Sequence, residues 1–560
     1  MSKELFALLS ESSKTALAEP NDVTEKTVRR RRFSLRWEYV AVVLAILLIS
    51  GIRFRLRDFP LERDEGEYAY AGQLILQGVP PYQLAYNMKL PGTYAAYAVI
   101  LKVFGETPAG IHLGLIVVNS VSIVLLFLVV RRLFDPMAAV VASATFGLFT
   151  IRPLLLGIAA HATHFVVLFA LLAIWIFLKA FDSDRLFLYF ASGFCFGLAF
   201  LMKQPGIFFG IFGALYLCFK KWPAPDQRAS FAGKLGGFSA GAVTPYVLTC
   251  LILWRAGVFS KFWFWTVSYA RAYASELTAR EGLRQFANRM ELQKEHIGLI
   301  WFLIVFGLAA FLWDRKIRSH APFMLGLLGF SFLAISVGLY FRGHYFIMIY
   351  PVLAILAGVG VSAGSSLLQR FAKVCWLAFA PPVLFVFIFA NAVYADRETY
   401  FYDSPNDACR YVYGTNPFPE ALEISEYIKE VASPQARLAV LGSEPEIYFY
   451  SQRRSATGYI YTYALVEEQK YGTVMQREME REIDAVKPEF LVYVLMHESW
   501  NTRPRADTRI FDWIESYIAQ NYVLEGVADG GNRDVYRWGA DAMRYRPRRR
   551  EYVLLYRRRP

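Results

Sequence analysis

Four carboxylates lie within a short stretch near the start of the chain, directly after its first long apolar run. They are Glu62, Asp64, Glu65 and Glu67. A carboxylate can act as a base, bind a cation or cap a helix, and in an exposed loop it does none of these. Its role therefore depends on which other charged residues share its surroundings.

Other ionisable and aromatic residues stand close to the ends of apolar stretches. Lys89 follows the four acids in the same connecting segment. The further candidates, all cations, histidines, amides or tyrosines, are Tyr68, Tyr82, His161, His164, Lys203, Gln204, Arg342, His344 and Tyr345. Ionisable residues at membrane depth are costly to bury, so they are candidates for function by default.

His161 and His164 are three residues apart, which places them on one face of a helix. Two such histidines could bind a metal ion, but the sequence shows no third ligand beside them. We therefore expect them to be polar groups that pack between helices, and we expect no metal site.

Cations and carboxylates together at the edge of a membrane would suit the transfer of a sugar from a lipid phosphate. The phosphate leaves when the sugar moves, so cationic side chains must stabilise its developing charge. Lys89, Lys203 and Arg342 have the right charge, and an arginine can bind phosphate through two donors. The accepting hydroxyl needs a base, for which Asp64 or Glu65 is available.

The composition indicates a multi-pass membrane protein of the inner or plasma membrane. The chain has 560 residues, of which 56% are hydrophobic and 19% charged, whereas soluble proteins carry about 25% charged residues. Apolar stretches recur, and roughly 20 such residues cross a bilayer as a helix. We predict about eleven transmembrane helices. They are expected at 38–54, 108–130, 136–151, 160–178, 186–202, 205–219, 235–254, 296–313, 321–341, 344–366 and 374–394.

Charge sets the expected orientation. Residues 1–37 form a basic tail that ends in Arg29–Arg32, and such segments stay in the cytoplasm. Alternation through the transmembrane part, residues 38–394, then puts residues 395–560 outside. Residues 255–295 also fall outside, although they are rich in arginine and lysine and so disagree with the rule.

Two further parts of the chain are expected outside the membrane core. In the first external loop, residues 65–77 and 93–103 are predicted to form helices that lie in the membrane interface. Residues 395–560 alternate short strands with helices, which predicts a small α/β domain with a largely parallel sheet. That domain has no glycine-rich nucleotide motif, and its basic C-terminus could contact anionic lipids or glycans. Nothing points to nucleic acid.

These motifs resemble those of the GT-C integral-membrane glycosyltransferases. The similarity rests on Asp64-Glu65 after the first span, Tyr68, Gly78-x-x-Pro81-Tyr82 and Lys89-x-Pro91. It is strongest to the bacterial branch similar to protein O-mannosyltransferases and the lipid A aminoarabinose transferase. The resemblance implies a polyprenyl-phosphate sugar as donor and a catalytic acid in the first external loop.

The resemblance also implies roles for single residues. By position, Asp64 is the catalytic residue with Glu65 assisting, and Lys89 meets the lipid phosphate. Lys203-Gln204 and Arg342 through Tyr345 resemble further segments of this branch. Met88 and Thr163 stand where relatives often carry acids, which argues against a bound metal.

The sequence thus predicts a membrane glycosyltransferase that transfers a hexose or pentose to a hydroxyl on the extracytoplasmic face. The acceptor could be a protein, a lipid or a glycan. Two alternatives remain: a transporter, whose charges would usually lie near mid-bilayer within an internal repeat, and a membrane anchor for a glycan-binding external domain. No cofactor is required by this chemistry, and a divalent cation is left open.

Asp64 has a competing structural interpretation. It stands where the loop is expected to meet a helix, and aspartate is a good helix N-cap. Glu62 and Glu67 flank it and are expected to face water.

Overall fold

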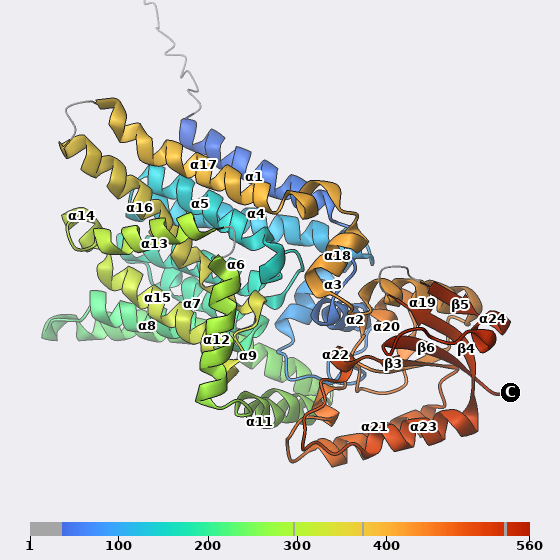
Figure 1. Cartoon of the computed structure of the whole chain (residues 1–560). Coiled ribbons are helices and arrows are strands. Elements are labelled where there is room, and N and C mark those ends of the chain that lie inside the picture. Colours follow the sequence, from blue (N-terminus) through green and yellow to red (C-terminus); the bar gives the residue numbers. More distant parts are fainter. Residues whose placement is uncertain (1–35, 295–296, 372–374, 531–534) are drawn as a thin grey trace, which may run out of the picture.

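The computed structural model describes residues 36–294, 297–371, 375–530 and 535–560. The predicted cytoplasmic tail with Arg29–Arg32 lies outside the described residues. The molecule has two parts, a large bundle of helices and a C-terminal domain built on a sheet, and α2 and α3 lie at their junction (Figure 1).

The helical part ends at Ala395. In chain order its helices are α1 (Trp37–Arg55), α2 (Arg63–Leu76), α3 (Gly92–Phe104), α4 (Pro108–Leu133), α5 (Pro136–Ile151), α6 (Ala162–Ser183), α7 (Leu186–Met202), α8 (Ile207–Lys220), α9 (Arg228–Arg255), α10 (Phe259–Trp263), α11 (Ala270–Ala274), α12 (Ala279–Lys294), α13 (Gly298–Ala310), α14 (Arg315–Arg318), α15 (Ala321–Ser336), α16 (Tyr350–Phe371) and α17 (Ala380–Ala395).

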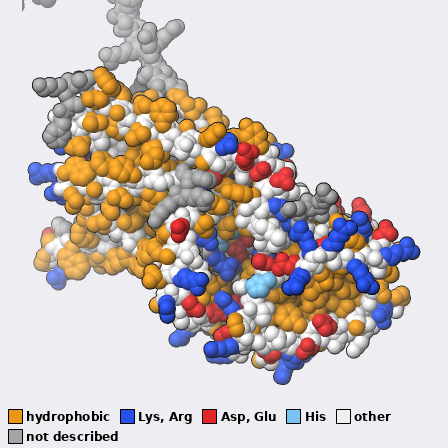
Figure 2. Space-filling model, viewed as in Figure 1, with side chains coloured by type: hydrophobic (Ala, Val, Ile, Leu, Met, Phe, Trp, Pro, Cys, Tyr) orange, Lys and Arg blue, Asp and Glu red, His pale blue; other side chains and the backbone are white. Residues whose placement is uncertain are grey.

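Each range predicted to cross the membrane falls on one of these helices. By length and composition, seven helices of the described chain could span a membrane, namely α1, α4, α6, α9, α15, α16 and α17. An eighth is counted if α12 and α13 form one bent span. Of the predicted spans, α5, α7 and α8 are apolar but shorter, and α13 counts only as part of the bent pair. For this reason the predicted count of eleven exceeds seven. The exposed surface of the bundle is mainly hydrophobic, whereas charged side chains gather over the C-terminal domain (Figure 2).

Local sequence explains where several helices begin. Helices α4 and α5 start at Pro108 and Pro136, and proline suits the first helical turn because its missing N–H would be unpaired there. The residues before them are caps: the side chain of Thr107 accepts a hydrogen bond from the N–H of Gly110, and Asp135 accepts one from Ala138.

The C-terminal domain has helices on both faces of a six-stranded sheet (Figure 1). Its helices are α18 (Pro405–Tyr413), α19 (Phe418–Val431), α20 (Glu446–Ser451), α21 (Gly472–Val486), α22 (His497–Trp500), α23 (Arg509–Asn521) and α24 (Ala540–Arg544). The strands are β1 (Arg437–Leu441), β2 (Arg454–Ser455), β3 (Phe490–Leu495), β4 (Tyr522–Asp529), β5 (Val535–Trp538) and β6 (Tyr552–Arg558).

The sheet is mixed, so the prediction of a largely parallel sheet is wrong. The strand order is β2-β1-β3-β6-β4-β5. Strand β1 pairs in parallel with β2 and β3, while the β3–β6, β6–β4 and β4–β5 pairs are antiparallel. The reason is that β4 and β5 follow one another in the chain as antiparallel neighbours, and β6 then returns between β3 and β4.

Alternate strand residues belong to two separate hydrophobic clusters, as expected when successive side chains point to opposite faces. Leu438, Val440 and Val492 pack in the cluster that includes α19 and α20. Ala439 and Leu491 pack in the cluster that includes α21 and α23. The core of the domain is therefore covered on both faces.

Helix α2, which the sequence predicts to lie in the membrane interface, is largely enclosed by the protein itself. Most of its residues are buried, from Glu65 to Leu74, because the C-terminal domain covers it. Helix α3 does expose apolar side chains, including Val99 and Val103. The two helices pack closely at Gly72, where a Cβ atom would lie 2.9 Å from the backbone nitrogen of Ala98.

Candidate active site

A cavity of about 400 Å³ lies where the helical part meets the C-terminal domain, a volume in the range of small-molecule sites. It is lined by the α2–α3 region, the α7–α8 junction, residues 265–274, residues 337–345 and residues 461–467 of the C-terminal domain. The sequence-predicted site residues that line it are Asp64, Tyr68, Lys89, Lys203, Gln204, Arg342, His344 and Tyr345.

Asp64 is not the cap of helix α2. The N-cap is Glu62, whose carboxylate accepts a hydrogen bond from the N–H of Glu65 at 3.0 Å. The Glu65 carboxylate in turn accepts one from the N–H of Glu62, which completes a capping box. The interpretation of Asp64 as a helix cap is therefore wrong, and its side chain faces the cavity.

Lys89 lies between two of the carboxylates of α2. Its ammonium group donates to Asp64 Oδ1 and to Glu67 Oε2, both at 2.6 Å. Glu67 also accepts hydrogen bonds from Asn87 and Tyr94. Glu67 is completely buried, contrary to the prediction that it faces water. This arrangement fixes the loop between α2 and α3 against α2.

Glu62 and Glu65 are also buried, which corrects the expectation that Glu62 faces water. The Glu65 carboxylate is 3.1 Å from His112 and accepts the N–H of Ala160 at 2.5 Å. These partners belong to α4 and to the segment before α6, so Glu65 joins three parts of the bundle. Glu65 does not line the cavity, although the sequence suggested an assisting role for it.

Asp64 keeps its charge despite partial burial. Burial alone would raise the pKa of its carboxyl group, but the positive charges of Lys89, His161 and Lys203 outweigh this effect and hold the pKa well below its usual value. The cavity therefore contains an ionised carboxylate beside an ammonium group.

Lys203 and Arg342 also face the cavity, as does the exposed Arg271. Among the residues that the structure describes, no carboxylate lies within ion-pair distance of Lys203 or Arg342. Lys203 ends helix α7, and its ammonium group lies over the ring of Tyr345, 4.1 Å from the centroid. The guanidinium of Arg342 donates to the hydroxyl of Tyr273 at 3.4 Å and lies over the ring of Tyr340, 5.5 Å from its centroid. Burial lowers the pKa of Lys203 to about 7, helped by the positive charges of Lys89 and Arg342.

The remaining predicted residues hold the loop that carries Lys89. The Gln204 amide donates to the carbonyl of Met88 at 2.6 Å, and the Tyr82 hydroxyl donates to the carbonyl of Lys89 at 2.7 Å. Tyr82 is buried and does not line the cavity. Tyr68 does, and the Lys89 ammonium lies over its ring at 4.6 Å.

The sequence missed the wall that the C-terminal domain supplies. Tyr461, Tyr463 and Glu467 line the cavity together with Trp265 and Tyr269. The alternating tyrosines after Tyr459 were the only local signal, and no spacing in the chain connects them to Asp64. Lys261, from the basic segment that disagreed with the charge rule, pairs with Glu478 of this domain at 2.6 Å.

Comparisons with known proteins agree with this architecture. Residues 89–247 match the family model of dolichyl-phosphate-mannose-protein mannosyltransferases. The crystal structure of ArnT from Cupriavidus metallidurans bound to undecaprenyl phosphate matches with a TM-score of 0.56 and 16% identity, covering 93% of this chain and 98% of that one. The crystal structure of the same protein in the apo state matches with a TM-score of 0.53 and 16% identity, covering 93% of this chain and 97% of that one. The apo oligosaccharyltransferase of Archaeoglobus fulgidus gives 0.50 and 14% identity over 91% and 75%. No curated protein sequence matches.

The predicted resemblance to the GT-C glycosyltransferases is confirmed. The chain has the GT-C fold, with the cavity that holds the candidate site at the junction of the two parts.

In this GT-C fold the first turn of α2 is held by the C-terminal domain. Arg63 forms a buried ion pair with Glu444 at 3.0 Å and donates to Asn416 at 2.6 Å. One turn further on, Gly66 touches α20 so closely that a Cβ atom would lie 2.6 Å from the backbone nitrogen of Glu446. The position of Asp64, which lies between Arg63 and Gly66 in the chain, is thus set by both parts.

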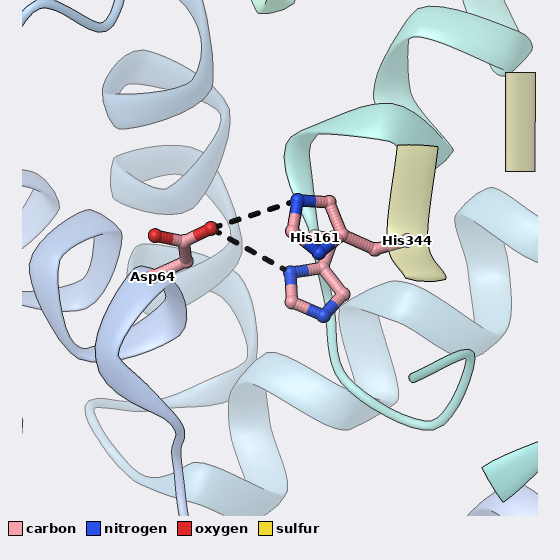
Figure 3. Close-up of side chains that lie close together, drawn as sticks. All are labelled: Asp64, His161 and His344. Carbon is pink, nitrogen blue, oxygen red and sulfur yellow. Dashed lines mark ion pairs between the residues drawn. The ribbon is translucent and has the colours of Figure 1, made fainter. Parts of the chain in front are cut away.

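A second set of contacts brings Asp64 to two histidines (Figure 3). Asp64 Oδ2 lies 3.8 Å from His344 Nε2 and 4.0 Å from His161 Nδ1, and the two imidazole rings stack with centroids 4.0 Å apart. His161 precedes helix α6 and does not share a face with His164, so the sequence paired it with the wrong histidine. His164 does not belong to this group.

The group of Asp64, His161 and His344 fits a divalent cation. One ligand atom from each residue lies within 4.8 Å of the others. Both ring nitrogens of His161 and Nδ1 of His344 are buried without a hydrogen-bond partner among the described residues, and such groups normally have one. Two histidines and a carboxylate are common zinc ligands. The prediction of no metal site rested on a missing third ligand, which Asp64 supplies from a distant part of the chain.

We predict that the protein, stripped with a chelator, rebinds about one zinc ion per chain, as expected for a single three-ligand site. His161→Ala and His344→Ala should lose this zinc, measured by elemental analysis after gel filtration. His164→Ala is the matched control and should retain it. Equal zinc content in all three variants would contradict the site.

We also predict that Gly66→Ala destabilises the protein. Alanine favours a helix by about 1 kcal/mol over glycine, but here its methyl group would collide with backbone atoms of α20, and such overpacking costs about 1–3 kcal/mol. Gly51→Ala in α1 is the control, because nothing lies within 4 Å of its added Cβ. The thermal melting temperature in detergent should fall only for Gly66→Ala. A melting temperature equal to that of Gly51→Ala would show that the contact is not tight.

Proposed function

We propose that the chain is a membrane glycosyltransferase that moves a sugar from a polyprenyl-phosphate donor to a hydroxyl acceptor. The observation that carries this proposal is the pair of unpaired cations, Lys203 and Arg342, facing the same cavity as the ionised Asp64. Cations without acidic partners in a buried site are costly unless an anion from outside binds there.

The donor phosphate would bind at Lys203 and Arg342. Arginine offers a planar pair of donors that matches phosphate oxygens, and lysine adds a compact charge. Lys89 completes the cationic set, although its ammonium group already contacts Asp64 and Glu67. ArnT, whose structure with undecaprenyl phosphate has the same fold, supports a lipid donor of this kind.

In the transfer step, the acceptor oxygen attacks the anomeric carbon of the sugar. The bond between that carbon and the phosphate oxygen breaks, and the polyprenyl phosphate leaves with the bonding electron pair. Asp64 takes the proton of the acceptor hydroxyl, while Lys203 and Arg342 stabilise the charge on the phosphate. No acid is needed for the leaving group, because a phosphate leaves as an anion.

A divalent cation, when bound by Asp64, His161 and His344, would supply Lewis-acid chemistry at the same place. The residues of the chain keep their separate tasks: Glu62 and Glu65 cap and anchor α2, and Lys89 orients Asp64. We further propose that the site lies on the extracytoplasmic face, on the same side as the C-terminal domain.

We predict that Asp64→Asn folds normally, binds the lipid donor and loses sugar transfer by about 10²-fold or more, because an amide cannot accept the proton. Transfer is measured with a radiolabelled polyprenyl-phosphate sugar in membranes. Asp58→Asn is the control, since Asp58 is exposed in the same region and its ion-pair partner among the described residues is Arg57. Near-normal transfer by Asp64→Asn would remove the base from this position. A transporter or a membrane anchor would show no transfer in the wild type either.

We predict that donor affinity depends on pH through Lys203. Its pKa of about 7 means that the side chain is protonated below pH 7 and becomes neutral above it. Because the bound phosphate favours the protonated form, affinity should fall by up to about tenfold per pH unit between pH 7 and 9. The donor is a phosphodiester and does not itself titrate in this range.

Lys203→Arg provides the test of this assignment. Arginine stays protonated throughout, so its affinity should be flat over the same pH range. Equilibrium binding of the lipid donor in detergent micelles measures both proteins. A fall of the same size in Lys203→Arg would assign the titration to another group.

A further inference from the structure

The wall of the cavity that the C-terminal domain supplies has a chemistry of its own. Tyr461, Tyr463 and Glu467 line it, and Tyr269 and Trp265 of the helical part stand beside them. The wall combines aromatic rings with one carboxylate. The cations that would bind phosphate come from other segments of the chain, around Lys203 and Arg342.

Glu467 is held in a fixed orientation at this wall. Its Oε2 accepts a hydrogen bond from the hydroxyl of Tyr269, and only 7% of the residue is exposed. Burial, together with the negative charge of Glu276, raises the pKa of Glu467 to about 7. Among the described residues no cation lies within ion-pair distance of Glu467, so the carboxylate has capacity for further hydrogen bonds.

Two tyrosine hydroxyls that face the cavity lack partners as well. No described residue forms a hydrogen bond with the hydroxyl of Tyr461 or Tyr345. Tyr463 differs, because its hydroxyl donates to the carbonyl of Glu498. The cavity thus presents a carboxylate oxygen and free hydroxyls close to aromatic faces, which is the set of groups that binds a polyhydroxylated ring.

We propose that this wall holds the sugar of the lipid donor, with Glu467 accepting hydrogen bonds from sugar hydroxyls and the Tyr461 hydroxyl forming a hydrogen bond with the sugar. The proposal rests on the proposed function, because it assumes that a lipid-phosphate sugar enters the cavity. It assigns recognition of the sugar to the C-terminal domain and recognition of the phosphate to the helical part.

The position of Tyr461 favours the sugar over the acceptor as the ligand. The Lys89 ammonium lies 5.4 Å from the centroid of the Tyr461 ring, so this wall adjoins the cations of the site. The sugar is covalently bonded to the phosphate and has to lie next to those cations. An acceptor approaches the anomeric carbon from the side away from the phosphate and has no such requirement.

The test compares lipids with and without a sugar. The probes are undecaprenyl phosphate alone and undecaprenyl phosphate that carries mannose, glucose or galactose. The variants are then tested with the hexose lipid that binds the wild type most tightly. Glu467→Gln and Tyr461→Phe each remove one hydrogen-bonding function while preserving shape. Both should weaken binding of that hexose lipid on the order of tenfold and leave undecaprenyl phosphate unchanged.

Tyr463→Phe is the matched control, because it removes a hydroxyl of the same wall that is already used within the protein. It should bind both lipids as the wild type does.

Equal losses of affinity for the two lipids in Glu467→Gln, or no loss for either lipid, would overturn the proposal. A raised KM for the acceptor in Glu467→Gln or Tyr461→Phe, with unchanged donor binding, would also overturn it, because this wall would then bind the acceptor. If the wild type binds undecaprenyl phosphate and binds none of the hexose lipids more tightly than that, the proposal for this wall is overturned while the proposed function stands. Failure to bind undecaprenyl phosphate at all would reject the proposed function first.

Discussion

Carboxylates crowded into the first turns of α2 have to be paired with positive or hydrogen-bonding groups, because an unpaired buried charge costs several kcal/mol. Lys89 meets this requirement for Asp64 and Glu67 together, and His112 meets it for Glu65. These partners come from the loop before α3 and from α4. The fold around the cavity therefore depends on bringing these distant segments, which carry the partners of the carboxylates, into contact with α2.

Much of the fold could be predicted because it is encoded locally. The helices of the bundle appear where long apolar runs stand in the sequence, and residues 395–560 form strands and helices in a small domain, as expected. The order of the strands is a different kind of information. It depends on which edges pair after the chain returns, and no residue of β6 specifies that it enters between β3 and β4.

In the candidate site, too, the residue types could be predicted locally, whereas the contacts between distant residues could not. Asp64, Lys89, Lys203 and Arg342 were recognisable from charge at the ends of apolar runs. Their pairing was not, because ion pairs such as Arg63–Glu444 join residues far apart in the chain. For this reason the sequence placed Glu62 and Glu67 in water, left a helix cap open as an alternative role for Asp64 and joined His161 to His164. The cavity wall with Glu467, in the C-terminal domain, carried no local signal that tied it to the segment between α1 and α4.

The place of β6 in the sheet has a consequence for how the protein folds during its synthesis. A chain emerges from the ribosome in sequence order, so α2 and its carboxylates are made early, whereas β6 is made after every other strand of the sheet and lies between two of them. The sheet of the domain that covers α2 cannot be completed until that strand has been synthesised. Until β6 has been made, the carboxylates of α2 lack the complete domain that covers them.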